Sequence, residues 1–196
     1  MSELLLNRFL RAFKDEILPL TFEGVNSGNK IFGAAIINKN DHSLVVAGTN
    51  NETKNPLWHG EIHTLKKFYE VDKKKRPDEK NCIFLSSHEP CSLCLSAITF
   101  AGFNNFYYLF PYESTSKEFN IPHDLNILKE IFNITNGEYI KENSYWKSYA
   151  INNLIEESNT NNKKELTDSF NQIKKIYINL SNKYQSSKKN KFIPLK

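Results

Sequence analysis

Two cysteines stand in the middle of the sequence at a spacing that could bind a metal ion. Cys91 and Cys94 form a Cys-x-x-Cys pair in the segment HEPCSLC, residues 88–94. Such a pair can be a disulfide, a redox couple or part of a metal site, but two thiolates alone do not complete a zinc site. Because the sequence holds only three cysteines, a further ligand must come from another residue type.

His59 is the best candidate for that third ligand. It stands at the predicted start of a helix in the segment PLWHGEIHTL, with Glu61 two residues further on. The cysteine pair also stands at the start of a predicted helix, and both helices follow strands, so the three side chains could converge at one end of a sheet. Three protein ligands plus a water molecule are typical of catalytic zinc. His63 is predicted to be a helix-face residue, because Gly60 occupies the position where zinc proteases need glutamate.

The elements that must position these side chains alternate between helices and strands. An amphipathic helix that ends at Pro19 is followed by a hairpin of two strands, 31–37 and 43–48. After the hairpin we expect helices at 60–71, 91–102, 123–132, 145–155 and 165–184, and strands at 82–87 and 105–110. This alternation predicts an α/β sandwich in which helices cover a sheet.

The composition is that of a soluble globular protein, and its charge is divided unevenly. No window approaches the roughly 18 apolar residues of a membrane span, and an odd number of cysteines argues against a disulfide framework. We therefore expect a cytoplasmic protein without a membrane segment. The net charge is +4, but residues 163–196 carry +7 and residues 1–162 carry −3. The basic charge belongs to the tail, which argues against a nucleic-acid-binding surface on the body.

The two motifs together match a known signature. HGE followed by PCSLC is the H-x-E…P-C-x-x-C pattern of zinc-dependent nucleobase deaminases. In this pattern and in the order of elements over residues 5–135, the chain resembles the cytidine deaminase superfamily. WHGEIHTL is similar to fungal-type cytosine deaminases, whereas EPCSLCLSAITFAG is similar to guanine and tRNA adenosine deaminases. The resemblance implies a three-layer α/β/α sandwich with a mixed sheet of about five strands over residues 1–156. Residues 157–196 are expected to form a linker, a C-terminal helix and a basic tail.

The resemblance also implies roles for the motif residues. His59, Cys91 and Cys94 would bind Zn²⁺, and zinc lowers the pKa of a bound water to about 7. Glu61 would take a proton from that water and deliver it to the ring nitrogen and then to the departing amine. Glu61 is therefore expected to act in proton transfer and not as a metal ligand.

Substrate contacts are predicted at three further residues. Related deaminases hold the base with an asparagine on the loop before the His-x-Glu helix. This sequence offers Asn50 and Asn51 there, of which we select Asn50, although the spacing to His59 is shorter here. Asn50 could equally be a turn residue. Trp58 could stack on or cover a base, and Phe100 matches a position that lines the pocket in guanine deaminases. Core packing would explain Phe100 equally well.

Three functions remain open at this point. The favoured one is a hydrolytic deaminase of a small nucleobase or nucleoside, of the cytosine/cytidine or the guanine type, which releases ammonia and, as the resemblance implies, forms a homodimer. For such a substrate the basic residues 184–196 are expected to be dispensable. The second is a tRNA adenosine deaminase that uses the lysine-rich tail for RNA phosphates. The third is a non-catalytic zinc module, against which Glu61 argues, because a structural site needs a fourth protein ligand instead.

Overall fold

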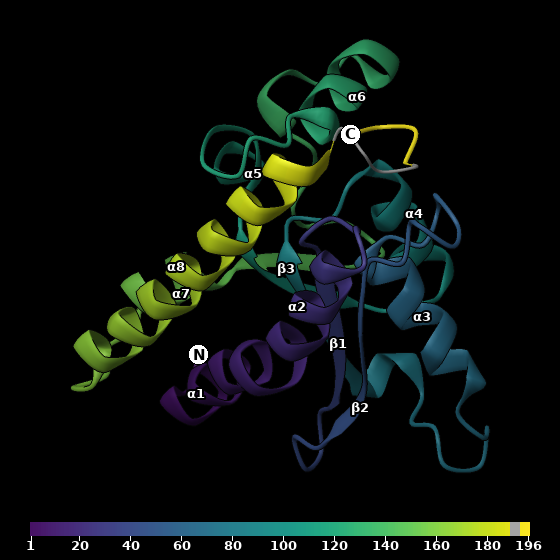
Figure 1. The fold of residues 1–196 in the computed structure, drawn as a ribbon. Coiled ribbons are helices and arrows are strands. Elements are labelled where there is room, and N and C mark those ends of the chain that lie inside the picture. Colours follow the sequence, from purple (N-terminus) through teal and green to yellow (C-terminus); the bar gives the residue numbers. More distant parts are fainter. Residues whose placement is uncertain (189–192) are drawn as a thin grey trace.

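The computed structural model describes residues 1–188 and 193–196 (Figure 1). Its centre is a five-stranded mixed sheet in the order β2-β1-β3-β4-β5. The strands are β1 (Gly33–Asn38), β2 (Leu44–Thr49), β3 (Cys82–His88), β4 (Asn105–Phe110) and β5 (Lys147–Ala150). β1 is antiparallel to both β2 and β3, whereas β3, β4 and β5 are parallel. Part of the predicted basic tail, including Lys189 and Lys191, lies outside the described residues.

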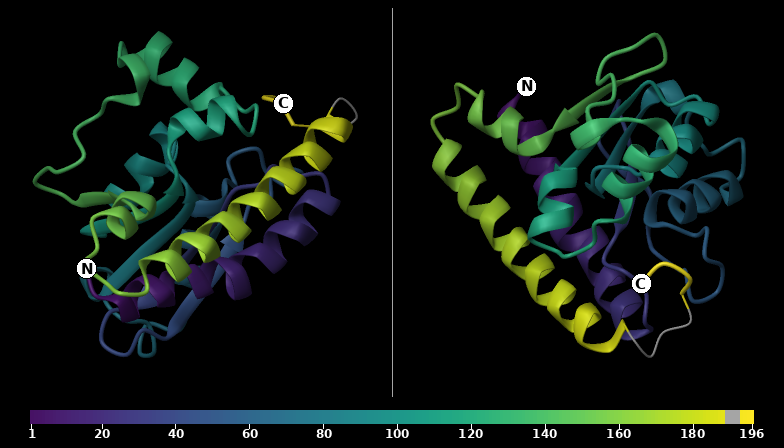
Figure 2. Two further views of the ribbon diagram at one scale, coloured as in Figure 1. Left: turned by 90° about the vertical axis from the view of Figure 1, so that its left-hand side faces the viewer. Right: turned by 90° about the horizontal axis from the view of Figure 1, so that it is seen from above.

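One face of the sheet is covered by the two ends of the chain. The helices on this face are α1 (Glu3–Arg11), η1 (Ala12–Ile17), α2 (Leu18–Asn26), α7 (Ile151–Glu156) and α8 (Lys163–Ser187). α8 lies alongside α1 and α2 in both views of Figure 2. Its buried side chains recur every three or four residues and join the same core as Phe9 and Phe13, namely Leu166, Phe170, Ile173, Tyr177, Leu180 and Tyr184. The C-terminal helix therefore completes one layer of the sandwich.

The other face of the sheet carries α3 (Gly60–Glu70) and α4 (Ser92–Phe100), which pack on a second core containing Phe68, Phe84, Ile98 and Phe106. After β4 come the shorter α5 (Tyr112–Lys117) and α6 (His123–Phe132), and two single turns, η2 (Glu79–Asn81) and η3 (Thr135–Gly137), complete the described elements. Helices on both faces of a mixed sheet confirm the predicted three-layer sandwich. Among the described residues, no helix combines the length and apolar content needed to cross a bilayer.

Two predicted elements differ in the structure. The first helix does not end at Pro19 but runs without a break from Glu3 to Asn26. Pro19 is the second residue of α2 and follows directly on the π-helical turn η1, whose wider hydrogen-bond spacing replaces the α-helical pattern just before the proline. The segment 145–155 is not one helix: it forms β5 and then α7. Pairing with the open edge of β4 outweighs the local helical pattern there.

Candidate functional site

The predicted ligands lie at the start of two neighbouring helices. His59 is the residue before α3, and Cys91 is the residue before α4, each with extended backbone angles. Cys94 follows in the first turn of α4 and is fully buried. A helix N-terminus has free N–H groups and the positive end of the helix dipole, which stabilise a thiolate. The fold therefore places both cysteines where their metal-binding form is favoured.

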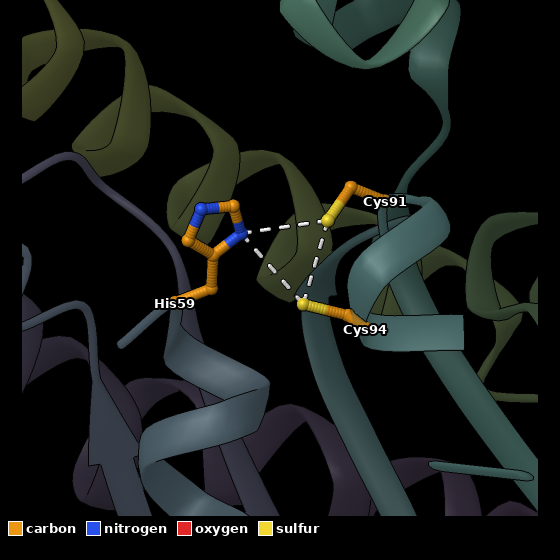
Figure 3. A group of neighbouring side chains, drawn as sticks. All are labelled: His59, Cys91 and Cys94. Atoms are coloured by element: carbon orange, nitrogen blue, oxygen red, sulfur yellow. Dashed lines mark hydrogen bonds between the residues drawn. The ribbon is translucent and has the colours of Figure 1, made fainter. Parts of the chain in front are cut away.

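The three ligand atoms point toward one another (Figure 3). The Cys91 Sγ lies 3.4 Å from His59 Nδ1, the Cys94 Sγ lies 3.8 Å from the same nitrogen, and the two sulfurs are 3.5 Å apart. Tetrahedral zinc, with Zn–S near 2.3 Å and Zn–N near 2.0 Å, holds such atoms about 3.5–3.8 Å apart. One nitrogen and two sulfurs are also a donor set that zinc prefers. The cluster fits the metal in both geometry and chemistry.

The charge of the cluster favours a cation. Burial lowers the pKa of His59, but the hydrogen-bonded Cys91 thiolate and the nearby carboxylates outweigh burial and raise that pKa to about 9. The hydrogen bond with Cys94 holds the pKa of Cys91 well below its ordinary value, against the effect of burial. Burial keeps the pKa of Cys94 high in the absence of a metal. The field that makes His59 take up a proton would equally stabilise a divalent metal ion.

Glu61 lies in the first turn of α3 and faces the cluster. Its side chain is buried, with Oε2 3.3 Å from the Cys94 Sγ and Oε1 2.8 Å from the Ser86 Oγ. Burial, and then the Cys91 thiolate, raise the pKa of this carboxyl. The Ser86 hydroxyl also lies 2.6 Å from the His88 carbonyl oxygen, and it can donate its one hydrogen to only one of the two acceptors. The carboxyl is thus held in place in a setting where it can carry a proton.

Gly60 lets α3 begin close to the sheet. A Cβ at this position would lie 2.8 Å from the backbone of Gly33 in β1, which is closer than real side chains approach. The Gly60 N–H also donates to the Asn50 Oδ1. Because Gly60 separates His59 from Glu61, this close approach fixes the ligand and the carboxyl relative to the sheet. The glycine of the HGE motif therefore has a packing role.

Asn50 is almost fully buried, and its described hydrogen bonds go to protein groups. Its Oδ1 accepts from Gly60, and its Nδ2 donates to the Glu52 Oε2 at 2.7 Å. It thereby joins the loop after β2 to the start of α3. These bonds leave one N–H of the Asn50 amide without a described partner, and this group could still donate to a substrate. The contact between Asn50 and a substrate therefore stays a prediction.

A cavity of about 370 Å³ opens over the cluster. Its wall contains His59 and Cys91, and also residues that were not predicted from the sequence: Lys30, Phe32, Glu52, Asp124, Ile193, Pro194 and Leu195. Isolated lysine, glutamate and aspartate residues in loops or first helical turns are by default solvated, so their types alone could not single them out. This volume lies in the range of roughly 300–1,000 Å³ that is usual for small-molecule sites.

The end of the chain contributes to this wall. Ile193 is only 3% exposed, and His123 Nε2 lies 2.9 Å from the Lys196 backbone oxygen. Tyr184, in the last turns of α8, is also buried in the core. The expectation that residues 184–196 are dispensable for a small substrate stays a prediction, but Tyr184 is part of the core and Ile193, Pro194 and Leu195 line the cavity, so a truncation would remove these contacts as well as the lysines.

The structure does not bring Trp58 or Phe100 into the cavity wall. Trp58 stacks in parallel on His63, with ring centroids 5.6 Å apart. Phe100 lies at the far end of α4, is 94% exposed, and lines a separate surface hollow with Ile140. Within one chain, neither ring stands against the metal-binding cluster. A role for either of them in substrate contact has no support from the described part of a single chain.

Comparison with known proteins places this geometry in a family. Residues 11–110, which include all three ligands and Glu61, match the model of the cytidine and deoxycytidylate deaminase zinc-binding region. The chain belongs to this family. It is accordingly a zinc-dependent deaminase, and His59, Cys91 and Cys94 form a possible metal site for its zinc.

The chain is similar to two curated relatives and to one solved structure. Guanine deaminase of Bacillus subtilis is 27% identical over 151 residues, which cover 70% of this chain and 94% of the relative. A probable cytosine deaminase of Schizosaccharomyces pombe is 26% identical over 91 residues, which cover 46% of this chain and 54% of the relative. The crystal structure of the Bacillus subtilis guanine deaminase superposes with a TM-score of 0.52 at 26% identity, over 73% of this chain and 87% of that one.

Proposed function

We propose that this deaminase hydrolyses the exocyclic amine of a free nucleobase, guanine in the first place, and releases ammonia. The observation that carries the proposal is the cavity over the candidate zinc site, part of whose wall is made by Ile193, Pro194 and Leu195 of the same chain. A planar base fits behind such a wall, whereas a base that remains attached to a folded RNA would need the wall to move away. Guanine is preferred to cytosine because the similarity to a guanine deaminase spans 94% of that protein.

The charges of the cavity favour a neutral ligand over a nucleotide. Lys30 is paired with Glu52, so this pair adds no net charge. Burial lowers the pKa of His123 and raises the pKa of Asp124, and both shifts favour the neutral forms. A phosphate would need unpaired cationic groups, as in other phosphate sites. The cavity wall therefore supports a free base or a nucleoside as substrate, and argues against a deoxycytidylate-type nucleotide.

The proposed reaction replaces the amine by an oxo group and consumes one water molecule. Zinc, when bound, lowers the pKa of a water molecule to about 7 and so supplies the nucleophile. The Glu61 carboxylate accepts a proton from this water and gives it to the ring nitrogen next to the attacked carbon. It then accepts the second proton, from the hydroxyl added to that carbon, and passes it to the departing amine as the C–N bond breaks. Ser86 holds the carboxyl during these steps through its contact with Oε1. The products are a ring carbonyl and ammonia.

A panel of substrates tests this proposal. Ammonia release is measured with guanine, cytosine, cytidine, deoxycytidylate, adenine and a tRNA anticodon hairpin, each at several concentrations. We expect guanine to give the highest kcat/KM and the hairpin to give no turnover, because the cavity wall excludes it. A highest value for cytosine would move the assignment to the pyrimidine type. Turnover of the hairpin above that of every free base would refute the proposal in favour of RNA chemistry.

We also propose that the protein forms a homodimer through the end of α4. Phe100 and Ile140 are 94% and 73% exposed, and they line an apolar surface hollow together with Leu95, Thr99 and Tyr139. Exposed apolar side chains gathered around a hollow are typical of interaction sites. A second copy of the chain would cover these side chains, and Phe100 would then be a contact residue of the dimer interface.

We also propose that the protein is cytoplasmic. All three cysteines are free, which supports the reducing cytoplasm as its compartment.

Light scattering after gel filtration tests the dimer. The parent protein should have twice the mass of one chain, and the double variant Phe100→Glu with Ile140→Glu should have the mass of a monomer, because each carboxylate would be buried in the interface. Leu4→Glu is the matched control, since Leu4 is 67% exposed on α1, and it should leave the dimer intact. A monomeric parent, or an unchanged dimer in the double variant, would contradict the proposed interface.

A further inference from the structure

A buried ion pair stands in the cavity wall beside the zinc site. Lys30, just before β1, places its Nζ 2.7 Å from the Glu52 Oε1, and the two side chains are only 6% and 1% exposed. The same carboxylate oxygen lies 3.9 Å from His59 Nε2. Both residues line the cavity that also contains His59 and Cys91. A base whose amine-bearing carbon lies at the zinc site is therefore within reach of this pair.

The hydrogen bonds of the pair hold the carboxylate firmly and leave donors on the lysine. The Glu52 Oε2 accepts from Asn50 Nδ2 at 2.7 Å and from the Lys30 backbone N–H at 3.3 Å, while Oε1 accepts from the Lys30 ammonium. A carboxylate has about four acceptor positions and an ammonium has three donors. Among the described contacts, two donors of Lys30 and one acceptor position of Glu52 remain for a ligand in the cavity.

A buried ion pair of this kind is weak evidence for a stabilising role. Two charges buried together lose so much hydration that well-packed apolar residues in their place are often neutral or stabilising. The pair is nevertheless enclosed at the cavity wall, with Asn50 fixing the carboxylate from behind. Its net charge is zero, so it can bind a neutral ligand through hydrogen bonds without attracting phosphates. These features together indicate a role in ligand recognition.

We propose that Lys30 and Glu52 determine substrate specificity by binding the edge of a purine that carries the 6-oxo group, with the Lys30 ammonium donating to O6 and the Glu52 carboxylate accepting a ring N–H. The proposal rests on the proposed function and names the feature of the base that this site recognises. Lysine is a common partner of the O6 and N7 acceptors of guanine. A purine with an amine at position 6 presents a donor to the ammonium and is disfavoured, whereas a purine with hydrogen there lacks the acceptor.

The test compares guanine with 2-aminopurine, which carries the same reacting 2-amine but no 6-oxo group. In Lys30→Met the ratio of kcat/KM for guanine over that for 2-aminopurine should fall about tenfold or more, because the lost contact exists only with guanine. The double variant Lys30→Met with Glu52→Gln removes both charges together, so that no unpaired charge stays buried, and should show the same fall. Lys117→Met is the matched control, since Lys117 pairs with Glu113 on the exposed surface of α5, and it should keep the parent ratio.

Binding of hypoxanthine gives a second readout that does not depend on turnover. Hypoxanthine keeps the 6-oxo edge but has no amine to lose, and unsubstituted purine lacks both groups. Calorimetry on zinc-loaded protein should show the parent preferring hypoxanthine to purine, with that preference lost in both Lys30 variants at unchanged zinc content. Normal guanine turnover in the parent, with both the kinetic ratio and the binding preference unchanged in the variants, would overturn this inference alone. Absence of guanine turnover in the parent would overturn the proposed function, and this inference with it.

Discussion

Replacement of Cys91 and Cys94 together by serine should yield a protein that is purified without zinc and releases no ammonia from any base in the panel. The two sulfurs supply two of the three protein ligands, and their spacing of 3.5 Å matches a shared metal. A serine hydroxyl is a poor zinc ligand because it is not ionised near neutral pH. Metal analysis by mass spectrometry, together with an ammonia assay, measures both effects.

Cys82 provides the matched control for this prediction. It is the third free cysteine, it begins β3, and its Sγ contacts the Asp78 backbone oxygen instead of the cluster. Burial raises the pKa of this thiol to about 11, so it stays protonated and unsuited to a metal. Cys82→Ala should keep one zinc per chain and full activity. Zinc retained at full occupancy in the Cys91 and Cys94 double variant would disprove the ligand assignment.

The zinc site was predictable because its signal is local and chemical. His59, Cys91 and Cys94 each stand at or next to a helix start that periodicity alone predicts, and the residue types admit few chemistries. The strand β4 was likewise predicted at its observed bounds, 105–110, because a continuous apolar run before a proline has few alternatives. Local patterns of this kind were sufficient to predict both the fold class and the residues of the candidate metal site.

The other wall of the cavity was not predictable from local patterns. Lys30 and Glu52 lie 22 residues apart, and only the folded chain shows that they form a pair. Ile193 is more than 100 residues from His59 and reaches the cavity through the packing of α8 across the sheet. An isolated lysine, glutamate or isoleucine has no chemical signature that would mark it as part of a site. The residues proposed to determine specificity are thus brought together only by the folded chain, whereas the residues proposed for catalysis stand in recognisable sequence motifs.

The same distinction explains the two wrong elements. Pro19 usually ends a helix, but the preceding π-helical turn lets the chain continue, and that turn depends on the packing of Phe13 and Ile17 against the sheet. Residues 147–150 become β5 because β4 offers an unpaired edge parallel to them. In both cases tertiary contacts outweigh a local preference of the backbone.

Replacement of Glu61 by glutamine should leave the zinc in place and remove most of the turnover. The amide keeps the shape of the side chain and its contact with Ser86, but it cannot accept a proton from water or carry one to the ring nitrogen. General acid and base catalysis by such a residue contributes about a hundredfold to ten-thousandfold, so kcat should fall by that factor while KM changes little. Single-turnover assays and metal analysis measure the two effects separately.

The thermal stability of the Glu61→Gln variant should not fall with its turnover. Because burial raises the pKa of Glu61 in the folded chain, its favourable contribution is present at low pH and is lost as the pH rises through that elevated pKa. In metal-free protein near pH 8, Glu61→Gln should therefore melt at the same temperature as the parent or higher. Glu70→Gln, at the exposed end of the same helix, is the control and should change neither turnover nor melting. Turnover of Glu61→Gln within a few-fold of the parent would refute proton transfer by this carboxyl, since only a residue that acts through packing or shape would be replaced by glutamine at little cost to the chemical step.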